Sequence, residues 1–325
     1  MSAFNMLAVG FNRASAKDLP VVERAIPLAW ISAALIASAL IVALLMRGAG
    51  LSIDPTAPGT LRFAAAFAAL ALVRSACRRP SSVATRIIRD IAEYVGLLMA
   101  ISLIGAVASY PVASYSRGYC DRILYRSDIA LHFHWVTWYQ MVAAHPVLQV
   151  LSRAAYSMIY VSPAILLGYL AMTNQRREAQ NFLAAIWLAA VITLVAFRFM
   201  PAVGPFAYLW HGPISYLPVS DLWQPQLIPQ LRDHTMPIID LGHLVGLVSA
   251  PSFHAAAGVL LLVFAARQPA IRTPLVAANV AMLLSTPVEG THYLTDVILG
   301  AVVACMSLGL VALALPKLGR KPVPA

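Results

Sequence analysis

Apolar runs long enough to cross a lipid bilayer recur along nearly the whole sequence, and they restrict the fold more than any other feature. The composition agrees, because hydrophobic residues make up 60% of the chain, charged residues only 11%, and the mean hydropathy is +0.77. These values lie well outside the range of soluble proteins. The sequence therefore predicts an all-α, polytopic helical membrane protein.

Eight spans are predicted, and the third is expected to end at Pro111. They cover residues 26–46, 60–77, 91–110, 154–172, 181–200, 252–266, 274–288 and 294–315. Residues 1–90 form an N-terminal tail, two extra spans and a basic cytoplasmic loop. Residues 91–316 form a six-helix membrane core, and residues 317–325 form a short tail.

The distribution of positive charge predicts the orientation. Segments on the side of the two termini hold 15 of the 23 Lys and Arg residues: Arg13, Lys17, Arg24, Arg74, Arg78, Arg79, Arg86, Arg89, Arg176, Arg177, Arg267, Arg272, Lys317, Arg320 and Lys321. Lys and Arg favour the cytoplasmic side of membrane proteins, so both termini are expected there. The net charge of +10 is assigned to these loops rather than to nucleic-acid binding.

Two segments of the core do not read as spans. Residues 112–152 mix charges with aromatic residues, which favours one or two amphipathic helices lying at the membrane interface. Arg122 and Arg126 in this segment would bind anionic lipid head groups or, alternatively, reach a substrate phosphate. Residues 201–251 form a long outer loop that begins with a proline-rich stretch.

Two histidines and an aspartate occur at the expected outer ends of the last spans. His292 and Asp296 are four residues apart, a spacing that places two side chains on one face of a helix. A carboxylate that holds one imidazole nitrogen fixes the tautomer and leaves the other nitrogen free. This pattern suits nucleophilic attack by His292, with His254 placed to protonate a leaving oxygen. The alternative is that the three residues only cap helices.

The neighbouring polar residues each have a structural alternative. Ser252 would cap the sixth span or contact phosphate through the helix start. Ser285 and Thr286 would bond back to their own helix or bind phosphate. Arg198 would extend to the interface or hold phosphate. Glu289 would contact acceptor hydroxyls or remain a solvated loop charge.

No metal or cofactor is expected. His234 and His243 lack the ligand spacing of a zinc site with the other histidines. The three cysteines, Cys77, Cys120 and Cys305, are isolated in the sequence.

The motifs resemble those of the type-2 phosphatidic acid phosphatase superfamily. Pro251-Ser252-Phe253-His254 is similar to its second motif, and Ser285, His292 and Asp296 keep the spacing of its third, with Gly290 where glycine is frequent. The resemblance implies that His292 is the nucleophile, Asp296 its orienting partner, and His254 the general acid and base. It also implies that Ser252 contacts phosphate.

The departures from the pattern point to one branch. Thr286 replaces the expected arginine, and Arg198-Phe-Met-Pro-Ala-Val-Gly-Pro205 is the nearest candidate for the first motif. The Pro-Ala-Val-Gly-Pro stretch, together with Asp121, Asp128 and Trp135 upstream, is similar to the inositol phosphorylceramide synthases and their bacterial relatives.

This resemblance implies a phosphotransferase that moves a phosphoryl-containing head group between a lipid and a hydroxyl acceptor, such as a polyol or sugar, through a phosphohistidine. The expected location is the bacterial inner membrane, with the site on the periplasmic side. Two alternatives stay open. One is a lipid phosphate phosphatase that uses water as acceptor, with phosphatidic acid or a polyprenyl phosphate or diphosphate as substrate. The other is a non-catalytic lipid-binding or transport protein.

Overall fold

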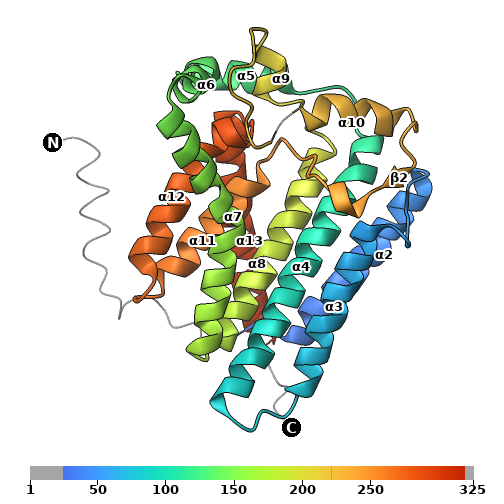
Figure 1. Ribbon diagram of the computed structural model, residues 1–325, viewed down its shortest axis with the longest axis vertical. Helices are drawn as coiled ribbons and strands as arrows, with labels where there is room; N and C mark the ends of the chain where they lie inside the picture. The colour runs from blue at the N-terminus through green and yellow to red at the C-terminus, as the bar shows by residue number, and fades with distance from the viewer. Residues whose placement is uncertain (1–24, 221, 319–325) are drawn as a thin grey trace, which may run out of the picture.

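Eight long helices in the computed structural model run along one axis and form a bundle (Figure 1). The structure describes residues 25–220 and 222–318. The helices are α2 (Leu28–Gly48), α3 (Pro58–Ala76), α4 (Val83–Tyr115), α7 (Pro146–Met172), α8 (Arg176–Phe197), α11 (Phe253–Ala266), α12 (Arg272–Glu289) and α13 (Leu294–Leu318). Each predicted span therefore corresponds to one helix. Most of the predicted N-terminal and C-terminal tails, with Arg13, Lys17, Arg24, Arg320 and Lys321, lies outside the described residues.

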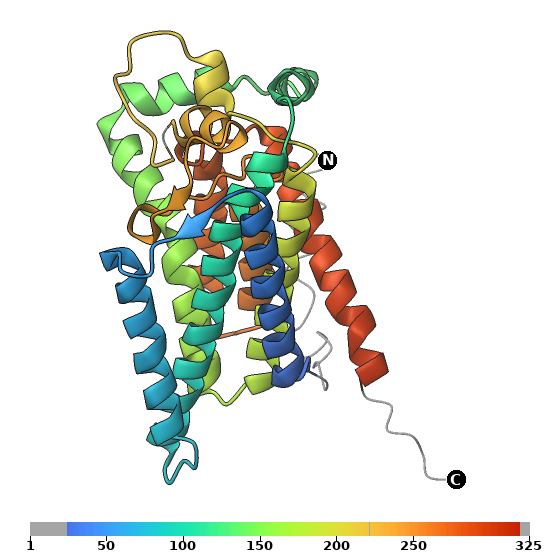
Figure 2. The same cartoon turned by 90° about the vertical axis from the view of Figure 1, so that its right-hand side faces the viewer.

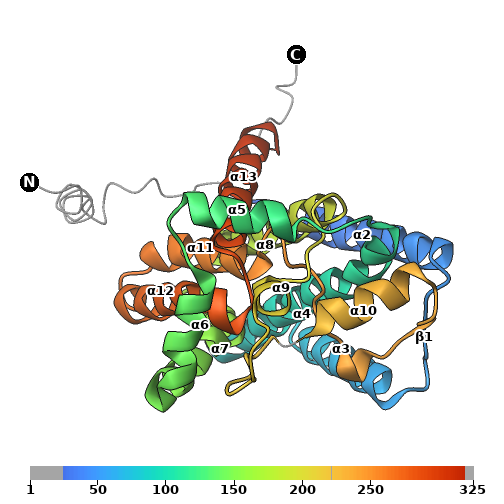
Figure 3. The same ribbon diagram turned by 90° about the horizontal axis from the view of Figure 1, so that it is seen from above.

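Six of these helices are long and apolar enough to cross a membrane: α2, α3, α4, α7, α8 and α13. Helix α11 is apolar but has only 14 residues, and α12 is interrupted by polar residues such as Asn279. Helix α11 packs inside the bundle, where it contacts α7, α8, α12 and α13. Helix α12 lies at the edge of the bundle (Figure 3) and leaves Val280 and Leu284 exposed. The chain is an integral membrane protein of helical architecture.

Four shorter helices cover one end of the bundle (Figure 3). They are α5 (Asp121–Ala130), α6 (Trp135–Ala144), α9 (Pro205–Leu209) and α10 (Trp223–Arg232). A 3-10 turn, η1 (Leu241–His243), and a two-residue parallel pairing of β1 (Ser52–Ile53) with β2 (Ile238–Ile239) complete this end. The proline-rich part of the predicted outer loop is thus partly helical. Proline is tolerated in the first turn of such helices, as at Pro205.

Three predicted boundaries were wrong. Helix α4 continues through Pro111 to Tyr115, because proline removes one backbone hydrogen bond without ending a helix that is packed on both sides. The same helix begins at Val83, where Ser82 and Thr85 form a capping box. Helix α7 begins at Pro146, eight residues before the predicted span, so the last part of the 112–152 segment is continuous with this helix.

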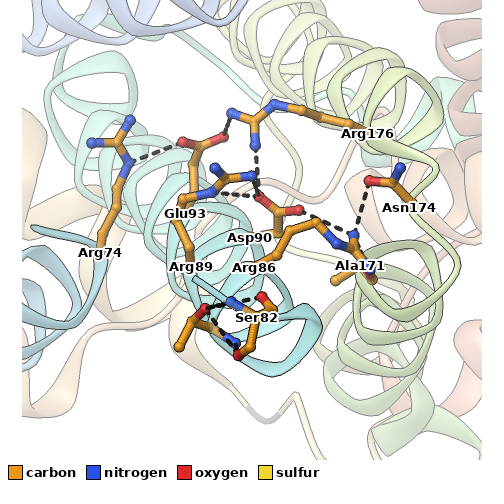
Figure 4. A network of polar contacts seen from close by, with 10 residues as sticks. Arg74, Ser82, Arg86, Arg89, Asp90, Glu93, Ala171, Asn174 and Arg176 are labelled. Atoms are coloured by element: carbon orange, nitrogen blue, oxygen red, sulfur yellow. Dashed lines mark hydrogen bonds and ion pairs between the residues drawn. The ribbon is translucent and has the colours of Figure 1, made fainter. Parts of the chain in front are cut away.

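The predicted basic loop contains an ion-pair cluster rather than only solvated cations (Figure 4). Asp90 and Glu93 are buried on α4. Arg176 at the start of α8 binds both carboxylates, with its Nη1 atom 2.7 Å from Asp90 Oδ1. Arg74 on α3 lies 2.9 Å from Glu93, and Arg89 lies 2.8 Å from Asp90. Buried carboxylates need such partners, so the cluster joins the end of α3 to the first turns of α4 and α8.

Close packing of α11 against α13 fixes how the N-terminal ends of these two helices lie relative to each other. A side chain at Gly300 of α13 would overlap the carbonyl oxygen of Ser252 and the Cβ atom of Ala255. The Ser252 N–H donates to the Asp296 carbonyl oxygen at 3.0 Å. These contacts place the start of α11 beside the start of α13, so the residues predicted to act together come from adjoining helix ends.

Candidate functional site

His292 lies in the tight turn between α12 and α13, so it precedes the helix on which it was predicted to lie. Its backbone N–H donates to the Pro287 carbonyl at 3.1 Å, and Thr291 before it has a φ of 49°. A Cβ atom at Gly290 would lie 2.7 Å from His292 Cδ2 and 2.8 Å from the Thr286 carbonyl oxygen. Glycine is therefore required here, because any side chain would displace the imidazole.

Asp296 lies in the first turn of α13 and faces His292. The His292 Nδ1 atom is 3.5 Å from Asp296 Oδ2, somewhat longer than a normal hydrogen bond. The Tyr293 N–H donates to the same carboxylate at 3.1 Å. Both side chains are buried, and His292 Nδ1 and Asp296 Oδ1 have no hydrogen-bond partner among the described residues.

His254 is the second residue of α11 and adjoins His292. The two ring centroids are 6.1 Å apart, and the half-buried His254 ring stacks on Tyr156 of α7 at 4.9 Å. Ser252 caps α11, since its Oγ atom accepts from the Ala255 N–H at 3.2 Å. Two imidazoles that lie side by side, one next to a carboxylate, can act as a nucleophile and a proton carrier at one reacting group.

Burial lowers the pKa of His292 to about 4, because the charged imidazolium loses its solvation. The imidazole is therefore neutral and able to act as a nucleophile at ordinary pH. Because the unfolded chain has the usual pKa of 6.5, protonation favours unfolding as the pH falls from 6.5 toward 4.

We expect the imidazole signal of His292 to titrate near pH 4 rather than near 6.5. The measurement is a pH titration of protein with isotope-labelled histidine by NMR in detergent, with the signal identified by its loss in His292→Ala. A midpoint near 6.5 would contradict the burial of this ring.

Two buried aspartates on α5 hold the backbone around this site, and neither was predicted to do so. Asp121 accepts hydrogen bonds from the N–H groups of Val203 and Gly204, both at 3.0 Å, and from the Tyr293 hydroxyl at 3.0 Å. Burial raises its pKa, while these donors oppose the rise. Asp121 thus connects α5 to the turn before α9 and to the residue after His292.

Asp128 caps the helix that carries Asp296. Its carboxylate accepts from the N–H groups of Leu294 and Thr295 at 2.9 and 2.8 Å, and from the Thr295 hydroxyl at 2.7 Å. Helix N-terminal N–H groups lack partners within the helix, so an acceptor at this position fixes the first turn. The sequence signal was the spacing of seven residues between Asp121 and Asp128, which places both on the inner face of an amphipathic helix.

Glu289 is fully buried, so the interpretation of a solvated loop charge was wrong. The Tyr216 hydroxyl donates to its Oε1 atom at 2.7 Å, and the Val219 N–H donates to Oε2 at 3.2 Å. Its backbone carbonyl accepts from the Ser220 N–H at 2.8 Å. Arg153 donates to the Tyr216 hydroxyl at 2.9 Å, and burial raises the pKa of Tyr216 to about 12.

The same segment contacts the aromatic residue behind His254. The Tyr156 hydroxyl and the Ser220 hydroxyl lie 3.3 Å apart, and Tyr156 carries the stacked His254 ring. Glu289 therefore attaches residues 216–220 to the end of α12 beside the two histidines.

The other phosphate-binding candidates have different surroundings. Ser285 and Thr286 both donate their hydroxyls to the Met282 carbonyl at 2.8 Å, which is the helix back-bonding alternative. Arg122 and Arg126 are exposed on the outer face of α5. Arg198 follows α8 and lines a groove between α2, α4 and α8, with its guanidinium 5.8 Å from the centre of the Phe199 ring.

His234 and His243, which were considered as zinc ligands, contact different parts of the chain. His234 Nδ1 contacts the Ala49 carbonyl at 3.0 Å, and His243 Nδ1 lies 2.7 Å from Asp240. Within residues 25–220 and 222–318 there is no group of three or more His, Cys, Asp or Glu side chains that could hold a metal ion.

Comparison with known proteins identifies the family. No curated protein and no solved structure matches the chain. A family model described as the PAP2 superfamily matches residues 122–310, which is more than half of the chain and includes His254, His292 and Asp296. Members of this superfamily are generally phosphatases and phosphotransferases that act on lipid phosphates in membranes. Since the match covers more than half of the chain, the chain belongs to the PAP2 superfamily.

Proposed function

We propose that the protein is a metal-independent phosphotransferase that moves a phosphoryl-containing head group between a lipid and a hydroxyl acceptor. The observation that carries the proposal is the arrangement of His254 and His292, 6.1 Å apart, with Asp296 beside His292. Membership of the PAP2 superfamily supports chemistry at a lipid phosphate. The distribution of Lys and Arg supports an extracytoplasmic location for this end of the bundle.

In the first step, His292 Nε2 attacks phosphorus and the bond to the leaving oxygen breaks. Asp296 stabilises the imidazole that gains positive charge, as its carboxylate lies next to Nδ1. His254 gives its proton to the departing alkoxide. The anionic phosphate of the bound substrate favours the protonated form of His254 that this step needs. The product is a phosphohistidine at residue 292.

In the second step, the acceptor hydroxyl gives its proton to His254 while its oxygen attacks the phosphohistidine. The phosphorus–nitrogen bond breaks and His292 is regenerated. Ser252 lies at the start of α11, whose free N–H groups favour an anion. Gly290 keeps the space around the His292 ring open. No metal enters either step.

Transfer is preferred over hydrolysis for two reasons. The stretch 201–205 and the aspartates Asp121 and Asp128 are similar to the inositol phosphorylceramide synthase branch, and Thr286 replaces an arginine of the usual phosphate clamp. Glu289 also holds residues 216–220 next to His254, and a covered site favours a bound alcohol over water. The second candidate is a lipid phosphate phosphatase, which the same histidines would support with water as acceptor.

The test uses purified protein in detergent with a panel of lipid phosphates and phospholipids, with and without polyol and sugar acceptors, in the presence of a chelator. Free phosphate and new phospholipid are both measured. Acceptor-dependent new lipid is expected, and it should disappear in His292→Ala and persist in His243→Ala, a change at an exposed histidine. Free phosphate alone would make the protein a phosphatase. No product in either assay would favour a non-catalytic lipid-binding role.

A further inference from the structure

A groove on the side of the bundle is lined by residues that do not include the two histidines. It lies between α2, α4 and α8, which pack side by side (Figure 2), and encloses about 510 Å³. Its lining is almost entirely apolar and includes Leu35, Ile101, Gly105, Trp187, Val195 and Phe199. The volume falls in the range of ligand pockets in proteins.

The groove is suited to a hydrocarbon chain. All three helices are membrane-span candidates, so the opening between them faces lipid rather than water. The polar atoms of its wall are paired, because the Trp187 Nε1–H donates to Ser38 Oγ at 3.1 Å and Ser38 donates to the Ala34 carbonyl at 2.8 Å. Gly105 contributes no side chain, which leaves room beside Ala190.

Among the described residues that line the groove, Arg198 at the C-terminal end of α8 is the one cation. Arg198 follows the last residue of α8, and residues 203 and 204 just beyond it are bound by Asp121. No ion pair joins Arg198 to a carboxylate in the part of the chain that the structure describes. The Arg198 guanidinium contacts the ring of Phe199, which is itself exposed. A guanidinium at the head-group level of a membrane binds phosphate oxygens well.

We propose that this groove binds an anionic phospholipid, with one acyl chain between α2, α4 and α8 and the phosphate against Arg198. The lipid is bound apart from the reacting phosphate at His292, so the inference goes beyond the proposed function. Helices α2 and α4 precede residues 122–310, so two of the three walls lie outside the family match. Arg198 is then a ligand of this second lipid instead of a clamp on the reacting group.

Trp187 supplies a local probe, because bromine atoms on a lipid chain quench nearby tryptophan fluorescence. Protein is reconstituted into phosphatidylcholine vesicles that contain increasing fractions of brominated-chain phosphatidylglycerol or, in parallel, brominated-chain phosphatidylcholine. The difference between the wild type and Trp187→Phe isolates the signal of the groove. We expect the phosphatidylglycerol to quench Trp187 with about a fivefold or greater preference over phosphatidylcholine.

The variants distinguish the contributions of the lipid head group, the acyl chain and the catalytic site to lipid binding. Arg198→Gln should abolish the preference, and Arg198→Lys should retain most of it. Arg177→Gln makes the same charge change at the opposite end of α8 and should have no effect. Gly105→Leu should reduce quenching by both lipids, since the new side chain fills the groove beside Ala190.

The readout does not depend on turnover, so it tests this site independently of the proposed chemistry. Equal quenching of Trp187 by both lipids in the wild type would overturn the proposal. A preference that survives Arg198→Gln but disappears in His292→Ala would overturn it too, because the anionic lipid would then bind at the catalytic histidines. Unchanged preference in His292→Ala, with loss in Arg198→Gln, supports it.

Discussion

Substitution of His292 by alanine is expected to reduce turnover of the lipid phosphate by about 10⁴-fold or more, because the proposed covalent intermediate forms on this side chain. Turnover must be compared in protein shown to be folded, because the buried imidazole also hydrogen-bonds to the backbone of Ser249 and its removal leaves a cavity. Asp296→Asn should cost less, about 10²- to 10⁴-fold, because it disturbs the tautomer and orientation of a nucleophile that is still present.

The double variant provides the sharper test. Asp296 acts only through His292 in the proposed mechanism, so adding Asp296→Asn to His292→Ala should reduce the rate little further. Additive losses would mean that the two residues act on different steps. His243→Ala is the matched control, since that ring is exposed and pairs with Asp240.

Trapping of the intermediate distinguishes the roles of the two histidines. In protein incubated with radiolabelled substrate and quenched rapidly, we expect an acid-labile phosphoenzyme in the wild type and none in His292→Ala. His254→Ala keeps the nucleophile but loses the proton acceptor of the second step, so any phosphoenzyme that forms should decay more slowly. A phosphoenzyme of normal amount in His292→Ala would contradict the assignment.

The long helices could be predicted from the sequence because each apolar run carries its own signal. Every predicted span corresponds to a helix, and His292 and Asp296 lie 3.5 Å apart although His292 precedes the helix that carries Asp296. The boundaries at Pro111 and Pro146 were missed for a physical reason. Proline at the first turn begins a helix, and proline in a helix interior kinks it without necessarily ending it, so neighbouring packing decides.

The contacts across the site could not be predicted, because they join residues far apart in the chain. Glu289 looked like a loop charge since it follows an apolar run, yet its carboxylate is satisfied by Tyr216 and Val219, seventy or more residues earlier. Arg198 lies near the expected place of a phosphate-binding motif in the sequence, and in the structure it lines the groove between α2, α4 and α8. A single sequence carries no direct signal for contacts between residues so far apart in the chain.

Asp121 and Asp128 on α5 show the same limit of sequence-based prediction within a single helix. Their spacing of seven residues predicts a shared face, but only the folded structure reveals which backbone groups that face meets. Asp128 meets the first turn of α13. The outer face of the same helix carries Arg122 and Arg126, which are exposed. One face of α5 therefore binds the backbone around the site, and the opposite face lies at the surface.

Replacing Asp128 with alanine is expected to lower the free energy of unfolding by about 1–3 kcal/mol, because the partly buried N–H groups of Leu294 and Thr295 lose their acceptor. Turnover should fall by about 100-fold even where the protein remains folded. The first turn of α13 carries Asp296, and a displacement of about 1 Å at a reacting group costs a factor of this size. Asp128→Asn keeps one carbonyl acceptor and should show smaller losses of both kinds.

Arg126→Gln is the matched control, because it changes a charge on the exposed face of the same helix two residues away. It should leave both the unfolding transition and turnover within about twofold of the wild type. The measurements are thermal unfolding in detergent and turnover well below the transition. Loss of stability with unchanged turnover would show that Asp128 only supports the fold, and equal losses in Arg126→Gln would assign the effect to the charge of α5. The expected result, slow turnover in folded Asp128→Ala with a normal Arg126→Gln, would make the cap on α13 a positioning element for the Asp296–His292 pair.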